Sequence, residues 1–254
     1  MIAGIVAARL ESTRLPGKAL FEINGKTILK IMFDRMSASK KLDRIIIATS
    51  TNKKDDLIEN FCNDNNIECY RGDEENLISR YKLIADKLGI DIIAKFGADC
   101  PLIDPRTIDE VIEFYLKNDY DYVSNYGPPP KTYPEGSTLD VYSSKILGEA
   151  FDEATKPSEF EHISPFICNR PERYKLHRID YKKDISNYRF SLDYQEDFVV
   201  IKSIFEALYP KNPYFTLEDI IDWLDSNPEI FKINSHIHFD LNNYYKKDIQ
   251  ASKK

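Results

Sequence analysis

The sequence predicts an α/β protein with a mainly parallel sheet and helices on both faces of that sheet. Short apolar runs alternate with stretches whose apolar residues recur at helical spacing, which is the pattern of repeated βαβ units. The run at residues 2–8 is continuously apolar and those at 44–49 and 91–96 are mostly apolar, as in strands covered on both faces. Such sheets bind ligands at the carboxyl ends of their strands, so we expect a site in the loops that follow these runs.

Capping signals divide the first 125 residues. Thr27 can cap a first helix, Asn52 with Asp55 a second, and Asp104 with Pro105 a later one, while Gly89 is suited to end a helix. On this basis we expect helices over residues 28–39, after 52, over 74–88 and over 107–116, and strands over 44–49, 67–70, 91–96 and 121–125.

The second half of the chain is less regular. Residues 127–131 form a proline-rich surface loop, after which we expect a strand entered through residues 135–142 and a helix over 144–154. An alternating strand over 188–192 leads to a helix over 196–209, and Thr216 with Asp219 caps a later helix. Only the Lys-rich tail after Tyr245 has the composition of a disordered segment.

Composition limits the functions open to the chain. Its 254 residues, 42% of them hydrophobic and 30% charged, are those of an ordinary globular protein. The formal net charge of −7 argues against a general nucleic-acid or membrane-surface binder. No run approaches the ~18 apolar residues of a membrane span, and Met1 leads directly into the first strand, so we expect a cytoplasmic protein. The four cysteines lack metal-binding spacing, so we expect reduced thiols and no zinc.

The loop after the first strand combines cations with hydroxyl groups, and Pro16–Gly17 shapes its turn. A polyphosphate, whose many oxygens need both charge and directed hydrogen bonds, suits these groups better than a single carboxylate. The loop matches neither G-x-G-x-x-G nor G-x-x-x-x-G-K-[ST], which disfavours a dinucleotide site and an ordinary P-loop. The alternative is a solvated connection whose charges face water. The side chains concerned are Arg9, Ser12, Thr13, Arg14 and Lys18.

Two acidic residues and one histidine are further candidates. Asp99 follows a buried strand, where a carboxylate beside phosphates would need a hard cation such as Mg²⁺ between them, although it could also form a turn. Asp193 precedes a helix and is either its cap or a second metal carboxylate. His162 stands among polar residues, and a lone histidine of this kind more often has a structural hydrogen bond than a chemical role.

Several of these stretches, in chain order over roughly residues 2–208, resemble the cytidylyltransferase superfamily. The likeness lies in residues 8–18, 72–81, 98–104 and 191–193, and it is greatest to the spore coat polysaccharide biosynthesis protein F group, with 3-deoxy-manno-octulosonate cytidylyltransferases as relatives. It implies a Rossmann-like nucleotidyltransferase fold, a homodimer, and Mg²⁺-dependent transfer of CMP from CTP to an acidic sugar with release of pyrophosphate. We expect one domain over residues 1–246, with a nucleotide half (1–125) and an acceptor half (126–246), and a disordered tail over 247–254.

The resemblance also implies a role for each matching residue. The loop residues would bind the triphosphate, and Arg14, Lys18 and Asp99 would be catalytic. Cytosine would be read by the backbone of Ala7 and Ala8 and by the Arg80 side chain. The metal ligands would be Asp99 and Asp193, and the acceptor side would include Asp140 and His162.

The sequence departs from the group at two places and leaves two alternatives open. Glu11 stands where the group has a small residue, and residues 137–140 differ from its Leu-Asp-Val-Glu, which bears on the acceptor. A glycosyltransferase would use a nucleotide sugar and a D-x-D metal motif, a spacing that Asp119-Tyr120-Asp121 shares. A non-catalytic CTP-binding protein is the other alternative, and the extra charge of Glu11 favours it.

Overall fold

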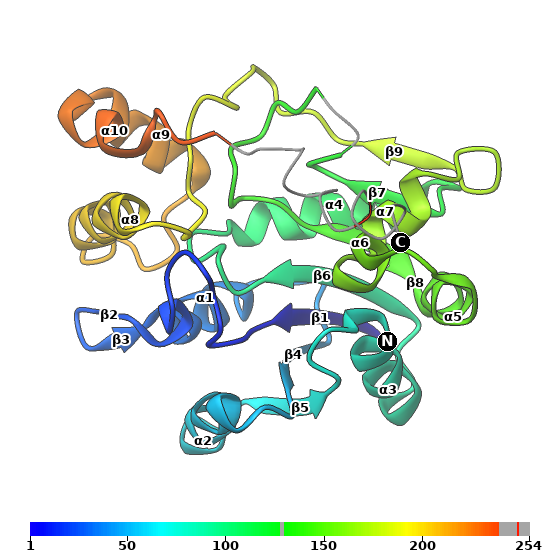
Figure 1. Cartoon of the computed structure of the whole chain (residues 1–254). Helices are drawn as coiled ribbons and strands as arrows, with labels where there is room; N and C mark the ends of the chain where they lie inside the picture. Colours follow the sequence, from blue (N-terminus) through cyan, green and yellow to red (C-terminus); the bar gives the residue numbers. More distant parts are fainter. Residues whose placement is uncertain (128–129, 239–247, 249–254) are drawn as a thin grey trace.

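A seven-stranded sheet forms the centre of the molecule in the computed structural model, which describes residues 1–127, 130–238 and 248 (Figure 1). Strand β8 is antiparallel to both of its neighbours, and the other strands run parallel to one another. The mainly parallel α/β fold is therefore confirmed. In order across the sheet the strands are β5 (Glu68–Gly72), β4 (Arg44–Ser50), β1 (Ile2–Ala7), β6 (Ile92–Gly97), β8 (Asp140–Ser143), β7 (Tyr122–Ser124) and β9 (Leu176–Arg178).

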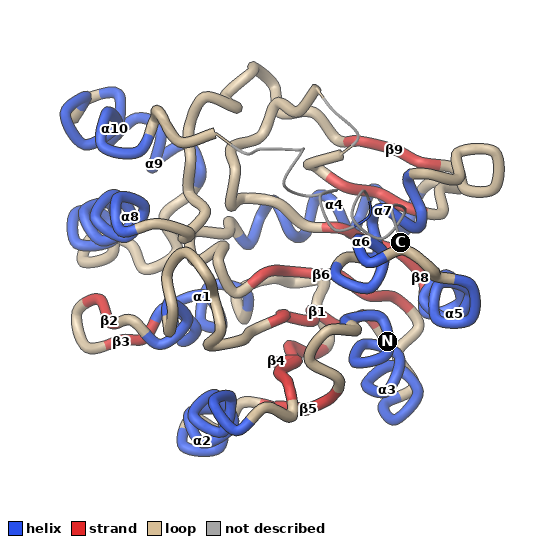
Figure 2. The backbone as a smooth tube through the Cα atoms, viewed as in Figure 1, coloured by secondary structure: helices blue, strands red, loops and turns tan. Residues whose placement is uncertain are grey.

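Helices cover both faces of the sheet (Figure 2). Along β1, Ile5 belongs to one core and Val6 to the other, because successive residues of a strand point to opposite faces. This two-sided burial explains why the central strands are mostly apolar. On the Val6 face lie α1 (Ile28–Met36), α2 (Asp56–Asp64), α4 (Pro105–Lys117), α8 (Gln195–Leu208), α9 (Leu217–Asp225) and α10 (Pro228–Asn234); on the Ile5 face lie α3 (Leu77–Leu88), α5 (Ser144–Glu153) and α7 (Ile163–Cys168), with α6 (Pro157–Glu161) beside α3.

Most of the predicted helix ends are confirmed. The side chain of Thr27 accepts from Lys30 N, that of Asp104 accepts from Arg106 N with Pro105 at the first helical position, and Thr216 forms a capping box. Gly89 ends α3 in the left-handed conformation, with φ of 64°. Two helices are shorter than expected, because α1 ends at Met36 and α3 begins only after its cap at Asn76.

Two segments differ from the sequence-based expectation. Residues 188–192 form no strand, because only Arg189 makes an isolated bridge, to Glu135. Asn52 caps a short 3₁₀ turn, η2 (Lys53–Asp55), which leads into α2 rather than belonging to it. Elements that the sequence did not predict are the short hairpin β2 (Glu22–Ile23) and β3 (Lys26–Thr27), the turn η1 (Lys18–Leu20), strand β9, and helices α6 and α7.

Some expectations fall beyond the described part of the chain. Residues 128–129 of the proline-rich loop and all of the tail 247–254 except Asp248 lie outside the described residues. Within the described ranges, no helix combines the length and apolar character needed to cross a bilayer.

Candidate active site

The loop after β1 is closed by its own backbone and by Asp55. Leu10 N donates to Asp55 Oδ1 at 2.8 Å, and Gly17 N donates back to Leu10 O at 2.9 Å. The Ser12 hydroxyl accepts from Leu15 N at 3.3 Å, while Thr13 is exposed on the loop. Gly17 has a φ of 75°, a left-handed conformation that glycine adopts at little cost. The loop therefore turns back on itself, and Lys18 follows at the start of η1.

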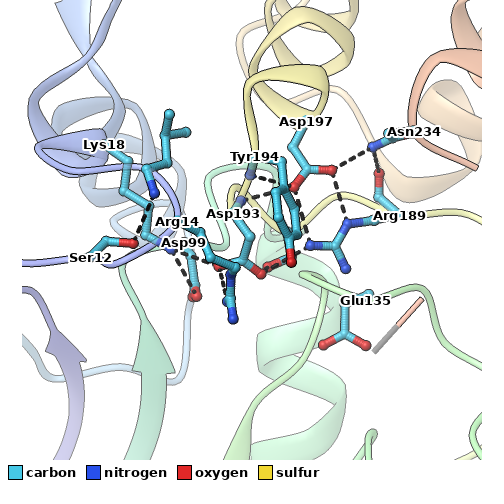
Figure 3. A network of polar contacts seen from close by, with 12 residues as sticks. Ser12, Arg14, Lys18, Asp99, Glu135, Arg189, Asp193, Tyr194, Asp197 and Asn234 are labelled. Atoms are coloured by element: carbon cyan, nitrogen blue, oxygen red, sulfur yellow. Dashed lines mark hydrogen bonds and ion pairs between the residues drawn. The ribbon is translucent and has the colours of Figure 1, made fainter. Parts of the chain in front are cut away.

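Arg14 and Lys18 meet two carboxylates from distant parts of the chain (Figure 3). Lys18 Nζ lies 2.9 Å from Asp193 Oδ1 and 3.4 Å from Asp99 Oδ2, and Arg14 Nη2 lies 2.6 Å from Asp193 Oδ1. The side chain of Lys18 is 13% exposed, against 50% for Arg14. The structure thus brings together four residues that the sequence singled out separately, with the ammonium group between the two carboxylates.

The backbone around Asp99 holds it against the segment that carries Asp193. Asp99 follows β6, and its carbonyl oxygen accepts from Leu192 N at 2.8 Å. A Cβ on Gly97 would lie 2.3 Å from Asp99 Oδ1, so any other residue here would push this carboxylate out of its present position. The resemblance between the two segments and a known family did not reveal this contact, because it joins residues far apart in the sequence.

Burial and charge act in opposite directions on this cluster. Burial alone would raise the pKa of Asp193, but the charges and hydrogen bonds of Lys18 and Arg14 outweigh it and hold that pKa well below its usual range. Burial would lower the pKa of Lys18, and the charges of Asp99 and Asp193 raise it instead. Asp193 and Lys18 are therefore both ionised at neutral pH.

Asp193 is not the cap of α8. Its backbone N and that of Tyr194 donate to Asp197 Oδ2 at 2.9 and 3.0 Å, so Asp197 caps the helix from within its first turn. The structural interpretation of the Asp193 side chain is therefore wrong, and this carboxylate is directed into the cluster with Asp99. Arg189, which also contacts Asp193, was missed; the spacing of Arg189, Asp193 and Asp197 at every fourth residue is the signal that could have found it.

Arg9 and Arg80 meet on the other side of the loop, near the ends of β1 and β4. Arg9 Nη1 and Arg80 Nη2 both donate to Glu74 O at 3.0 Å, and Arg80 Nη1 donates to Ala48 O at 3.2 Å. Burial lowers the pKa of Arg80. Ala7 and Ala8 continue the sheet here, since Ala98 N donates to Ala7 O and Ala8 N to Ala48 O. The guanidinium of Arg80 therefore organises the backbone of residues 73–74 beside these two alanines.

The charge of Glu11 is neutralised by a neighbour. Its carboxylate forms an ion pair with Lys54, and the hydrogen bond and charge of Lys54 lower the pKa of Glu11. The negative charge that the loop carries at this position is thus matched by a cation, which removes the feature that favoured a non-catalytic binding protein.

Asp140 and His162 lie on the β8 side of the cluster. Asp140 is buried and accepts from Tyr122 Oη at 2.6 Å, Ser124 Oγ at 2.9 Å and Lys95 Nζ at 3.2 Å. His162 connects α6 to α7. Burial, followed by the charge of Lys95, lowers the pKa of His162 to about 4, against the opposing charges of Glu161, Asp140 and Asp99. His162 is therefore neutral at physiological pH and close enough to Asp140 and Asp99 to sense their charge.

The D-x-D spacing at residues 119–121 belongs to another edge of the sheet. Asp119 forms an ion pair with Lys175, and Asp121 Oδ2 accepts from Lys175 N at 2.9 Å. Both residues precede β7, which runs parallel to β6, whereas Asp99 follows β6. This motif therefore lies at the opposite ends of the strands from the cluster, and the glycosyltransferase alternative loses its support.

The carboxylates of the cluster fit a hard cation. Within the described residues no group of three or more His, Cys, Asp and Glu side chains is arranged to hold a metal ion, so the chain provides only two carboxylates here. Mg²⁺ in nucleotide sites commonly uses one or two carboxylates together with phosphate oxygens. Because a lysine ammonium already lies between Asp99 and Asp193, the position favours positive charge.

Comparison with known proteins gives consistent matches over almost the whole chain. A family model described as "Cytidylyltransferase" matches residues 3–237. An uncharacterised protein of Methanocaldococcus jannaschii is 32% identical over 93% of this chain and 95% of its own length. The spore coat polysaccharide biosynthesis protein SpsF of Bacillus subtilis is 27% identical, with 89% and 94% covered. The solved structure of a cytidylyltransferase from Leptospira borgpetersenii has a TM-score of 0.86 at 28% identity, covering 94% of this chain and 98% of that one.

Proposed function

The chain belongs to the cytidylyltransferase family and is a CTP-dependent nucleotidyltransferase, and we propose that its acceptor is an acidic sugar of the ulosonic acid type. In this reaction an acceptor oxygen attacks the α-phosphate of CTP, a CMP-sugar forms and pyrophosphate leaves. The product would serve the synthesis of a surface polysaccharide or glycan, which is the process that the name of the Bacillus subtilis relative gives. We also propose that the enzyme is a cytoplasmic homodimer.

The observation that carries the proposed mechanism of nucleotidyl transfer is the position of Lys18 between Asp99 and Asp193. Lys18 and Arg14 balance these two carboxylates when no phosphate is present. A triphosphate would offer both cations stronger partners, and the two carboxylates would then hold Mg²⁺ against the phosphate oxygens. Bound there, Mg²⁺ would neutralise charge on the phosphates as the reaction proceeds.

Most of the work of the chain is positioning and neutralisation of charge. In our proposal Arg9, Ser12 and Thr13 belong to the same triphosphate loop, and Lys18 and Arg14 stabilise the charge that develops on the phosphoryl group and pyrophosphate. The backbone of Ala7 and Ala8 and the Arg80 side chain would form the cytosine pocket. No covalent intermediate with the protein is needed, because the acceptor itself is the nucleophile.

Asp140 and His162 would contact the acceptor. Asp140 belongs to β8, which pairs with β6, and His162 lies close enough to Lys95 and Asp140 for their charges to act on it. A neutral His162 can donate or accept a hydrogen bond to a sugar hydroxyl, and buried Asp140 holds Lys95 where its ammonium could meet the acceptor's carboxylate.

The first experiment is pyrophosphate release from each of the four nucleoside triphosphates with Mg²⁺ and a panel of octulosonates and nonulosonates, with product masses recorded. We expect a CMP-sugar with CTP alone. Turnover with a neutral sugar but with none of the acids would contradict the acceptor class.

The metal assignment is tested separately by Asp99→Asn. This change keeps the size of the side chain but removes a charged ligand, so we expect metal-dependent turnover to fall by about 10²-fold or more. Normal turnover of the variant at limiting Mg²⁺ would contradict the assignment.

A further inference from the structure

The two oxygens of Asp193 have different partners. Oδ1 meets Arg14 and Lys18, which come from the phosphate-binding loop. Oδ2 accepts from Arg189 Nη2 at 3.0 Å and from Ser191 Oγ at 3.1 Å. In Figure 3 Arg14 and Lys18 lie on one side of this carboxylate and Arg189 lies on the other. Only Oδ1 therefore faces the place where a triphosphate and its metal would lie.

Arg189 is itself held rigidly. Its Nε donates to Asp197 Oδ1 at 2.9 Å and its Nη2 to Asp197 Oδ2 at 3.1 Å, and Asp197 is fully buried. Asn234 Nδ2 then donates to Asp197 Oδ1 at 2.9 Å and to Arg189 O at 3.1 Å. Asn234 is the last residue of α10, so this chain of contacts extends from the C-terminal helix to Asp193.

We propose that Arg189 is a positioning residue, which fixes Asp193 so that Oδ1 alone is presented to the metal, and that Asn234 makes α10 part of this support. The inference rests on the proposed function, because it assumes a divalent cation at Asp99 and Asp193. Mg²⁺ demands near-octahedral ligands at short distance, whereas the larger Ca²⁺ accepts both oxygens of one carboxylate. By occupying Oδ2, Arg189 favours the smaller ion.

The chain contains a matched control for this arrangement. Arg170 Nη1 donates to Glu159 Oε1 at 2.8 Å, and Glu159 is fully buried like Asp197. Glu159 Oε2 also accepts from Thr155 N and Lys156 N, as Asp197 does from its own neighbours. Loss of Arg170 therefore breaks the ion pair of another fully buried carboxylate at a helix start, but one that has no contact with Asp193 among the described residues.

The test compares Arg189→Met with Arg170→Met. The dissociation constant of Mn²⁺ is measured by electron paramagnetic resonance at saturating CTP, with Ca²⁺ as competitor, alongside the CTP dissociation constant without metal and the melting temperature. We expect Arg189→Met to weaken Mn²⁺ binding about tenfold or more and to leave Ca²⁺ binding unchanged or tighter. We expect Arg170→Met also to lower the melting temperature but to leave the dissociation constants of Mn²⁺ and Ca²⁺ unchanged.

Two results would overturn the inference: unchanged Mn²⁺ binding in Arg189→Met, or equal weakening in Arg170→Met. If Arg189→Met fails to fold, Arg189→Lys takes its place, because it keeps the charge without the planar fork. We expect Arg189→Lys to lose the preference for Mn²⁺ over Ca²⁺, and a preference equal to that of the wild type would refute the inference. Asn234→Ala leaves the contact between Arg189 and Asp193 intact and removes only the support from Asn234. We therefore expect this variant to bind Mn²⁺ more weakly than the wild type, but by less than Arg189→Met.

The proposed function can fail separately. If Asp99→Asn weakens Mn²⁺ binding and Arg189→Met does not, only the positioning role is wrong. If wild-type protein with CTP binds no Mn²⁺ at all, the metal site fails and the inference fails with it.

Discussion

Replacement of Lys18 by Met should have opposite effects on metal binding and on turnover. Without nucleotide, the two cations Arg14 and Lys18 balance the two carboxylates Asp99 and Asp193, and the variant leaves this group with one excess negative charge. Met keeps the length and apolar stem of Lys, so the change is mainly electrostatic. We therefore expect the variant without nucleotide to bind a divalent cation more tightly than the wild type, and to catalyse transfer more slowly.

The distances set the size of the first effect. Lys18 Nζ lies 2.9 and 3.4 Å from the two carboxylates, and its side chain is only 13% exposed. Two unit charges about 4 Å apart interact by about 4 kcal/mol at an effective dielectric constant of about 20. If about a third of this interaction energy opposes binding of the metal ion, removal of the Lys18 charge tightens metal binding about tenfold. Loss of a preorganised charge that stabilises the transition state costs about 10²–10³-fold in kcat.

The assay for Lys18→Met is Mn²⁺ binding without nucleotide, followed by pyrophosphate release at saturating CTP and Mg²⁺. Lys26→Met is the matched control, because Lys26 pairs with Asp34 and Tyr209 and contacts neither acid of the cluster. If Lys18→Met binds Mn²⁺ more weakly than the wild type, Lys18 does not compete with the metal. If kcat stays within about twofold of the wild type, Lys18 does not act on the phosphates.

Acid unfolding gives a third readout of the same variant. The folded pKa of Asp193 is depressed, so its ion pairs stabilise the protein above the unfolded pKa of about 3.9, and this stability is lost as the pH falls through the lower folded pKa. Lys18→Met removes one cause of the depression. We expect acid unfolding of the variant to begin at a higher pH than in the wild type, and Lys26→Met to shift it less, because Asp34 keeps its ion pair with Lys30.

Three further predictions concern separate residues. His162→Ala should raise the acceptor KM by about tenfold with little change in CTP affinity, and an unchanged acceptor KM would return His162 to a structural role. Because the pKa of His162 is lowered to about 4, kcat of the wild type should show no histidine titration near pH 6.5. Arg35→Met should lower the free energy of unfolding in urea by about 3 kcal/mol and leave kcat unchanged, because the backbone carbonyls of Ile103, Pro213 and Phe215 would lose the buried guanidinium that donates to them. A loss below about 1 kcal/mol would show that water replaces the guanidinium as donor. Glu11→Gly should change the CTP KM by less than about twofold, since Lys54 already balances Glu11; a large gain in affinity would show that Glu11 repels phosphate.

Local signals predicted much of the fold. Thr27, Asp104 and Thr216 cap helices through contacts within three residues, so the sequence around each contains the whole interaction. The mostly apolar central strands were also predictable, because burial on both faces favours apolar residues. By contrast, β9 has only three residues, and its place in the sheet depends on pairing with β7, more than 50 residues earlier.

The site could be predicted less well from sequence patterns, because its main contacts join residues that are far apart in the sequence. Asp193 and Asp197 both lie near the start of α8 and either could cap it. Arg189 contacts both acids, and what separates them is that Asp193 also meets Lys18, which is 175 residues away in sequence. No pattern within residues 188–198 contains the contact with Lys18, and the resemblance to a family supplied the role of Asp193 without its partners.

The arrangement of charge also explains why acids and bases are interleaved at one site. A cluster of cations alone would bind triphosphate but would repel a metal, and a cluster of acids alone would do the reverse. In our proposal Lys18 and Arg14, which pair with Asp193, exchange it for phosphate oxygens when CTP binds, and the Arg14 side chain is already half-exposed. Arg189 cannot exchange in this way, because Asp197 and Asn234 hold it in the core. In our proposal Asp193 keeps Arg189 on Oδ2 while Lys18 and Arg14 leave Oδ1, so nucleotide binding would expose the oxygen proposed to face the metal and Asp193 would stay in place.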